Sequence, residues 1–146
     1  MIAPFKIFLS LFGFLLIQSQ ALSAALPVIE LKIGKTTVQA EVATTPSSQQ
    51  LGLMYRKELP TNSGMLFIFS DKAGHCFWMK NTLIPLSIAF LEDDGKIINI
   101  EEMLPQTEES HCPTRATRFA LEMNTEWFST RKIAPGTVVT GLPKLQ

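Results

Sequence analysis

Most of the chain beyond residue 25 alternates apolar and polar residues with a period of two, which predicts β-strands. Two features between the apolar runs are typical of tight hairpin turns, Gly34-Lys35 and Asp93-Asp94-Gly95. Short strands at regular spacing indicate a mainly β domain, a compact antiparallel β-sandwich or barrel. We expect strands at 28–33, 37–42, 64–69, 76–80, 87–91, 96–100, 117–123 and 137–140.

One or two short helices are expected at the periphery of this sheet. Thr45 followed by Pro46 predicts a helix start, with Thr as N-cap and Pro at the first helical position. That helix should run to about Tyr55. Asn124 could cap a second, shorter helix through Trp127 and Phe128.

The first 25 residues follow a different pattern. Lys6 precedes an apolar run over 7–17, and small residues follow up to Ala25. This order is typical of a cleaved secretory signal peptide, with cleavage expected after Ala21 or Ala25. The run is about 11 residues long, whereas a spanning helix needs roughly 20. We therefore expect residues 1–25 to be a signal peptide and 26–146 a single β domain that is periplasmic or secreted; an uncleaved anchor is the alternative.

The charge balance narrows the class of function. The 146 residues contain 13 Lys and Arg against 13 Asp and Glu. A nucleic-acid-binding domain usually shows a basic excess, so none of that kind is expected here. A single domain fits the length.

The two cysteines, Cys76 and Cys112, are the sharpest chemical feature. In a small exported domain they predict one disulfide. It would close a loop of about 36 residues and stabilise the fold by roughly 3–4 kcal/mol in the chain-entropy model. Two free thiols are one alternative. A Cys₂His₂ metal site with His75 and His111 is another, but neighbouring residues of an extended strand point to opposite sides.

The expected strand at 76–80 continues into residues that could bind a ligand. Strand alternation would place Trp78, Lys80 and Thr82 on one face, and Phe77, Met79 and Asn81 on the other. A Trp ring beside polar groups suits flat ligands such as sugar rings. In the plainer interpretation Phe77 and Met79 belong to the core, Asn81-Thr82 turn the chain and Lys80 is solvated.

Arg56 and Glu122 form a candidate ion pair. Glu122 follows the apolar residues 119–121, where an acid must face solvent or be paired. Arg56 could bind its carboxylate through two hydrogen bonds. Alternatively, Arg56 is an exposed charge or a cation at the end of the first helix.

Several segments together resemble one family. They are Leu53-Met54-Tyr55-Arg56, Gly64-Met65-Leu66-Phe67, Phe77-Trp78-Met79-Lys80-Asn81-Thr82, Ile84-Pro85-Leu86, Ile88-Ala89-Phe90, Asp94-Gly95 and Ala120-Leu121-Glu122. Their order and spacing resemble the domain of unknown function 192 family over nearly all of 28–142. The resemblance implies a small exported protein with a jelly-roll-like β-sandwich and no established activity. Where many relatives have Asp, this chain has Ser87.

No catalytic constellation emerges, since both histidines sit beside the cysteines and no phosphate-binding loop is present. We expect a non-enzymatic module that binds a small molecule, a glycan or an envelope protein. A carbohydrate-active hydrolase or lyase using Glu122, Lys80 and Arg56 is the alternative, and a purely structural partner of another envelope protein is a third. The expectation includes no cofactor, no metal, no membrane span after signal removal and a monomer. The candidate ligand-binding residues are Arg56, Trp78, Lys80, Asn81, Thr82 and Glu122.

Overall fold

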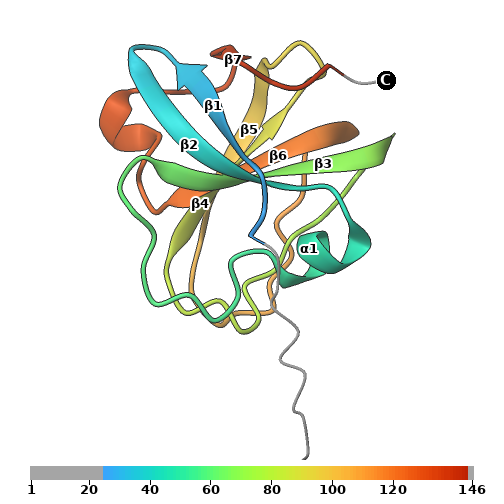
Figure 1. The fold of residues 1–146 in the computed structure, drawn as a ribbon, viewed down its shortest axis with the longest axis vertical. Coiled ribbons are helices and arrows are strands. Elements are labelled where there is room, and N and C mark those ends of the chain that lie inside the picture. Colours follow the sequence, from blue (N-terminus) through green and yellow to red (C-terminus); the bar gives the residue numbers. More distant parts are fainter. Residues whose placement is uncertain (1–24, 145–146) are drawn as a thin grey trace, which may run out of the picture.

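A computed structural model describes residues 25–144, so the expected signal peptide lies almost wholly outside the described residues. The predicted mainly β class is confirmed, and the strands form one curled, half-barrel sheet with the order β5-β4-β6-β3-β2-β1-β7 (Figure 1). All neighbouring strands are antiparallel except β2 and β3, which are parallel. The elements are β1 (Val28–Ile33), β2 (Thr36–Ala43), α1 (Pro46–Leu51), β3 (Ser63–Ala73), β4 (Leu86–Leu91), β5 (Ile97–Met103), β6 (Thr117–Asn124), η1 (Ser129–Arg131) and β7 (Val139–Thr140).

The two predicted hairpins are present. Gly34 turns β1 into β2 with a φ of 60°, and Gly95 turns β4 into β5 with a φ of 86°. Both values lie in the left-handed region that favours glycine. At the second turn the Val139 N–H donates to the Gly95 carbonyl at 2.8 Å. The C-terminal strand thus pairs with β1 and also contacts the β4–β5 turn, which curls the sheet toward closure.

Each face of the sheet carries its own apolar cluster, because successive side chains of a strand point to opposite faces. Leu66 and Leu121 belong to the cluster that Trp127 and Phe128 cover. Met65 and Ala120, their neighbours in sequence, belong to the opposite cluster, which the loops between strands cover. We call this second, loop-covered side of the sheet the outer face.

The helices are shorter than predicted. Thr45 is the N-cap of α1, as expected: its Oγ1 accepts from the Ser48 N–H at 3.2 Å. The helix ends at Leu51 rather than near Tyr55, because Gly52 adopts a φ of 48° and leaves the helical conformation. The helix predicted from Asn124 is absent, and turns lead instead into the short 3₁₀ segment η1. No helix within 25–144 is both long enough and apolar enough to cross a membrane.

Candidate functional site

Glu122 is a buried acid on the outer face of β6. Its strand neighbours are Met65 of β3 and Ile88 of β4, both fully buried. The residue is 5% exposed, and no hydrogen bond or nearby charge from residues 25–144 acts on its carboxyl group. Burial alone raises the pKa of Glu122 from 4.5 to about 8. The free protein therefore holds this side chain neutral over most of the physiological pH range.

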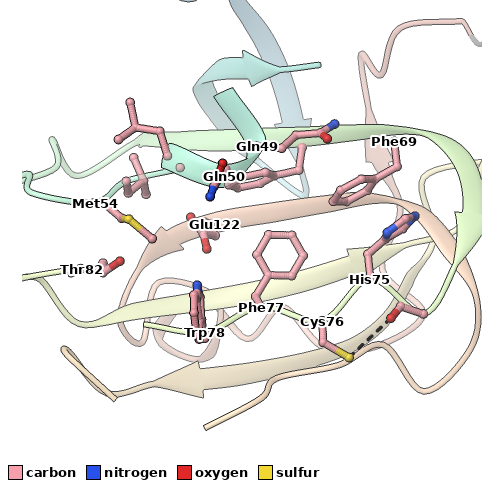
Figure 2. A pocket seen from close by; sticks show the side chains of 15 residues that line it. Gln49, Gln50, Met54, Phe69, His75, Cys76, Phe77, Trp78, Thr82 and Glu122 are labelled. Atoms are coloured by element: carbon pink, nitrogen blue, oxygen red, sulfur yellow. Dashed lines mark hydrogen bonds between the residues drawn. The ribbon is translucent and has the colours of Figure 1, made fainter. Parts of the chain in front are cut away.

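A pocket of about 460 Å³ lies over this carboxyl group, and we call it the Glu122 pocket. In Figure 2 the α1 side chains Gln49 and Gln50 lie on one side of Glu122, and the segment that carries Phe77 and Trp78 lies on the other. The lining residues are Gln49, Gln50, Leu51, Gly52, Leu53, Met54, Phe67, Phe69, Gly74, His75, Cys76, Phe77, Trp78, Thr82 and Glu122.

Aromatic rings form one wall of the Glu122 pocket. The Phe77 ring packs edge-on against Phe67, with 4.9 Å between the ring centroids, and against Phe69 at 6.1 Å. The His75 ring stacks on Phe69 at 3.7 Å. Trp78 is 48% exposed at the pocket mouth, where its ring is open to a ligand. The wall therefore offers flat apolar area next to a single buried acid.

Uncharged polar groups complete the lining. Gln49 Nε2 donates to the Ile68 carbonyl at 2.7 Å, which fastens α1 to β3 and leaves the amide oxygen of Gln49 as an acceptor. Thr82 is buried, and its side chain faces the pocket. The sequence pattern did not identify Gln49, Gln50, Met54, Phe69 or His75 as ligand-pocket residues. Only the helix start at Thr45 pointed to this region, and no local signal brings it near β6.

The segment 76–80 is not the strand that was predicted. Phe77 exchanges two backbone hydrogen bonds with His111, each 2.8 Å long, and Met79 donates to the Thr107 carbonyl. The segment thus pairs with a loop instead of joining the sheet. Asn81 then adopts a φ of 58°, which breaks the alternation. As a result Thr82 is buried over the Glu122 pocket, whereas Lys80 lies outside it.

The predicted disulfide between Cys76 and Cys112 is confirmed. It joins the pocket wall to the loop after β5, directly beside the Phe77–His111 bridge. Because both sulfurs are in the disulfide, the free-thiol and Cys₂His₂ alternatives do not apply. Within the described part of the chain, no three His, Cys, Asp or Glu side chains come together as a metal site would require.

Lys80 and Asn81 line a second, more open depression outside Trp78, which we call the outer hollow. Lys80 Nζ lies 5.2 Å from the centroid of the Trp78 ring and 3.1 Å from Glu108 Oε1. Trp78 also lines the Glu122 pocket, as do Gln50, Leu51 and Met54, so the two depressions adjoin and share these side chains.

The predicted pair between Arg56 and Glu122 is wrong. Arg56 instead binds Glu41 of β2, through Nη1 to Oε1 at 2.5 Å and Nη2 to Oε2 at 2.7 Å. This hydrogen bonding raises the pKa of the guanidinium group further above its ordinary value. Glu41 lies near the end of β2, and β3 separates β2 from β6 in the sheet, so the guanidinium group that binds Glu41 is held away from Glu122. Arg56 lines a separate depression with Glu41 and takes no part in the Glu122 pocket.

The profile of the DUF192 family, described as "Uncharacterized ACR", matches residues 29–141. The chain belongs to this family. Two crystal structures are similar to this DUF192 domain. A proposed transcription regulator from Sinorhizobium meliloti is 30% identical, with a TM-score of 0.73 over 78% of this chain and 92% of that one. A protein of unknown function from Novosphingobium aromaticivorans is 32% identical, with a TM-score of 0.75 over 78% and 85%. No curated protein sequence matches significantly.

The Trp-Met-Lys-Asn-Thr segment of this DUF192 domain divides between three environments. Trp78 and Thr82 line the Glu122 pocket. Met79 is fully buried beneath them. Lys80 and Asn81 face the outer hollow. Of the six candidate ligand-binding residues, the structure brings Trp78, Thr82 and Glu122 together in one pocket. Lys80 and Asn81 line the adjoining outer hollow, and Arg56 lies in a separate depression.

Proposed function

We propose that this chain is an exported, non-enzymatic domain that binds a small molecule in the Glu122 pocket. One observation carries the proposal: Glu122, a residue that is only 5% exposed, lines a pocket, and desolvation is the one influence on its carboxyl group, with no hydrogen bond or charge from the described protein. A buried polar group without a hydrogen bond costs roughly 1–3 kcal/mol, so folding alone would favour an apolar residue here. A ligand that contacts the carboxyl group would supply the missing partner.

The remaining lining supports binding by the same site. A volume of about 460 Å³ falls within the range of small-molecule pockets. Such pockets combine apolar and aromatic walls with few polar groups that orient the ligand. Phe77 and Trp78 supply the first, and Thr82 and Glu122 the second.

Export rests on two separate features. The first 25 residues have the order of a signal peptide, and the Cys76–Cys112 disulfide suits an oxidising compartment. Fractionation of the producing cells, followed by intact mass measurement, tests this part. A protein that remains in the cytoplasm at its full length would contradict it.

An enzyme is the second candidate, a carbohydrate-active hydrolase or lyase with Glu122 as general acid. The pKa of about 8 favours this candidate, because perturbed acids cluster at catalytic sites. Two observations weaken it. Arg56 and Lys80 do not line the pocket, and no second Asp or Glu among its lining residues provides the carboxyl pair of most glycosidases. Release of reducing ends from envelope glycans by the wild type, but not by Glu122→Gln, would establish this activity.

A thermal-shift screen tests the binding proposal. Small molecules of positive, negative and zero charge are screened against the wild type, Trp78→Ala, Glu122→Gln and Lys57→Ala. We expect at least one ligand that raises the Tm of the wild type and loses that effect in the first two variants. Lys57→Ala is the matched control, because Lys57 is exposed and lines neither the Glu122 pocket nor the outer hollow, so that its loss should leave binding intact. Ligands that act equally on Trp78→Ala, or a screen without any ligand, would overturn the proposal.

A further inference from the structure

The charged groups around the Glu122 pocket make it suited to a cation. Glu122 is its only carboxylic acid, and α1 contributes no charged residue. The basic groups nearby are already paired outside the pocket, Lys80 with Glu108 and Arg56 with Glu41. β3 and β4 place the apolar residues Met65 and Ile88 beside the acid. No Lys or Arg is among the residues that line the Glu122 pocket. Arg118, which lies on the same face of β6 four residues before Glu122, is outside that lining.

His75 is the other titratable group in the lining. Its ring stacks on Phe69, and its Nε2 lies 3.2 Å from the Asp71 carbonyl oxygen and 3.6 Å from Asp71 Oδ1. These contacts orient the imidazole toward β3 and Asp71. His75 therefore borders the pocket without pairing with Glu122.

The aromatic wall of the Glu122 pocket is a second reason to expect a cationic ligand. Organic cations bind favourably over the faces of Trp and Phe rings, and quaternary ammonium groups are commonly held by such rings. Lys80 Nζ already lies over Trp78 on the side of the outer hollow, at 5.2 Å from the ring centroid. The Trp78 and Phe77 rings also line the Glu122 pocket, where no cation of the protein occupies them.

We propose that the ligand of the Glu122 pocket carries an organic ammonium group, which pairs with the carboxylate of Glu122 and contacts the Trp78 and Phe77 rings. This inference rests on the proposed function and names its ligand class. Thr82 Oγ1 and the amide oxygen of Gln49 provide further acceptors for an ammonium group that carries N–H donors. A methylated ammonium group would rely on the rings instead.

Proton linkage separates a cation from a neutral ligand. Below the raised pKa of Glu122 the free carboxyl group is protonated, so an ammonium ligand must displace that proton. Its affinity should rise up to about tenfold per pH unit from pH 6 toward pH 8. A neutral ligand that accepts a hydrogen bond from the protonated carboxyl group should show no proton release and bind less tightly as pH rises.

Isothermal titration calorimetry with three probes tests the inference: choline, ethanolamine and 3,3-dimethyl-1-butanol, the uncharged isostere of choline. Measurements in two buffers of different ionisation enthalpy report proton release from the wild type, independently of any variant. We expect choline or ethanolamine to bind with proton release and at least tenfold more tightly than the isostere. Glu122→Gln should weaken binding at least tenfold, whereas Glu58→Gln, a change at an exposed acid outside the pocket, should leave it unchanged.

The outcomes are distinguishable. Binding by choline alone identifies a methylated ammonium held by rings, and binding by ethanolamine alone identifies one held by hydrogen bonds; both support the inference. Equal affinity for the isostere, absence of proton release, or no binding of either cation would overturn it. A neutral ligand from the thermal-shift screen that is lost in Trp78→Ala would then preserve the proposed function without its cationic ligand.

Discussion

Arg56 holds Glu41 through two parallel hydrogen bonds, at 2.5 and 2.7 Å. The pair ties the loop after α1 to β2, and so fixes the helix that supplies Gln49 and Gln50 to the Glu122 pocket. The pair also holds the guanidinium group beside β2, away from β6. Arg56 is therefore absent from the lining of the Glu122 pocket, which contains no Lys or Arg, and the proposed function depends on that separation.

Arg56→Lys should lower the free energy of unfolding by roughly 0.5–1.5 kcal/mol. Lysine keeps the charge but loses the bidentate geometry, and the modest size follows from the partial exposure of the pair. Urea denaturation of Arg56→Lys, Glu41→Gln and the double variant measures the coupling. Lys57→Ala, at the exposed neighbouring position, should be neutral. Additive effects of the two single variants would show that the pair contributes nothing.

Gly64→Ala should destabilise the fold by about 1–3 kcal/mol, in the range of overpacked core sites. A Cβ atom at Gly64 would lie 2.5 Å from the Glu122 carbonyl oxygen and would also overlap Met123 Sδ. The backbone carbonyl cannot move without separating β3 from β6. Gly74→Ala is the control, because a Cβ there meets nothing within 4 Å. Equal midpoints of urea denaturation for the two variants would contradict this account.

Local signals account for what the sequence predicted about the fold. The period-two pattern located the strands at 28–33 and 87–91 within one residue of β1 and β4. Gly95 marked its hairpin, and Thr45 marked the start of α1. The parallel pairing of β2 with β3 has no such signal, because it depends on a connection that carries α1 across the sheet.

The site was predicted less completely, since its parts meet only in three dimensions. Trp78 and Glu122 were identified from their own segments. Their association with α1 depends on the order of strands, which the alternation does not encode. The error at Arg56 has the same origin: Glu41 and Glu122 are both strand acids, and only the tertiary fold decides which one the guanidinium group reaches.

Reduction of the Cys76–Cys112 disulfide should lower the free energy of unfolding by roughly 3–4 kcal/mol, because it frees a loop with a sequence separation of 36. The same bond holds the Phe77 and Trp78 wall, so ligands of the Glu122 pocket should bind less tightly after reduction. Urea denaturation with and without dithiothreitol measures the first effect. The double variant Cys76→Ser/Cys112→Ser should be less stable and insensitive to dithiothreitol. If dithiothreitol still lowers the stability of that variant, its effect on the wild type does not come from the Cys76–Cys112 disulfide.

Glu122 should make the free protein less stable as pH rises from about 5 to 8. The unfolded carboxyl group titrates near 4.5, whereas burial raises the pKa of the folded one to about 8. Between these values the folded state holds a proton that the unfolded state releases, so each increase in pH favours unfolding. The free energy of unfolding falls by up to about 1.4 kcal/mol per pH unit in this range. It becomes independent of pH below the unfolded pKa of 4.5 and above the folded pKa of about 8.

Glu122→Gln removes this titration but keeps a buried polar side chain of similar size. Urea denaturation at pH 5, 6, 7 and 8 should therefore show the variant gaining stability relative to the wild type with each step. Glu58→Gln should follow the wild type, because that acid is exposed. Parallel curves for the wild type and Glu122→Gln would mean that Glu122 is ionised or paired in solution, and the pocket would then lose the unsatisfied acid from which its ligand was inferred.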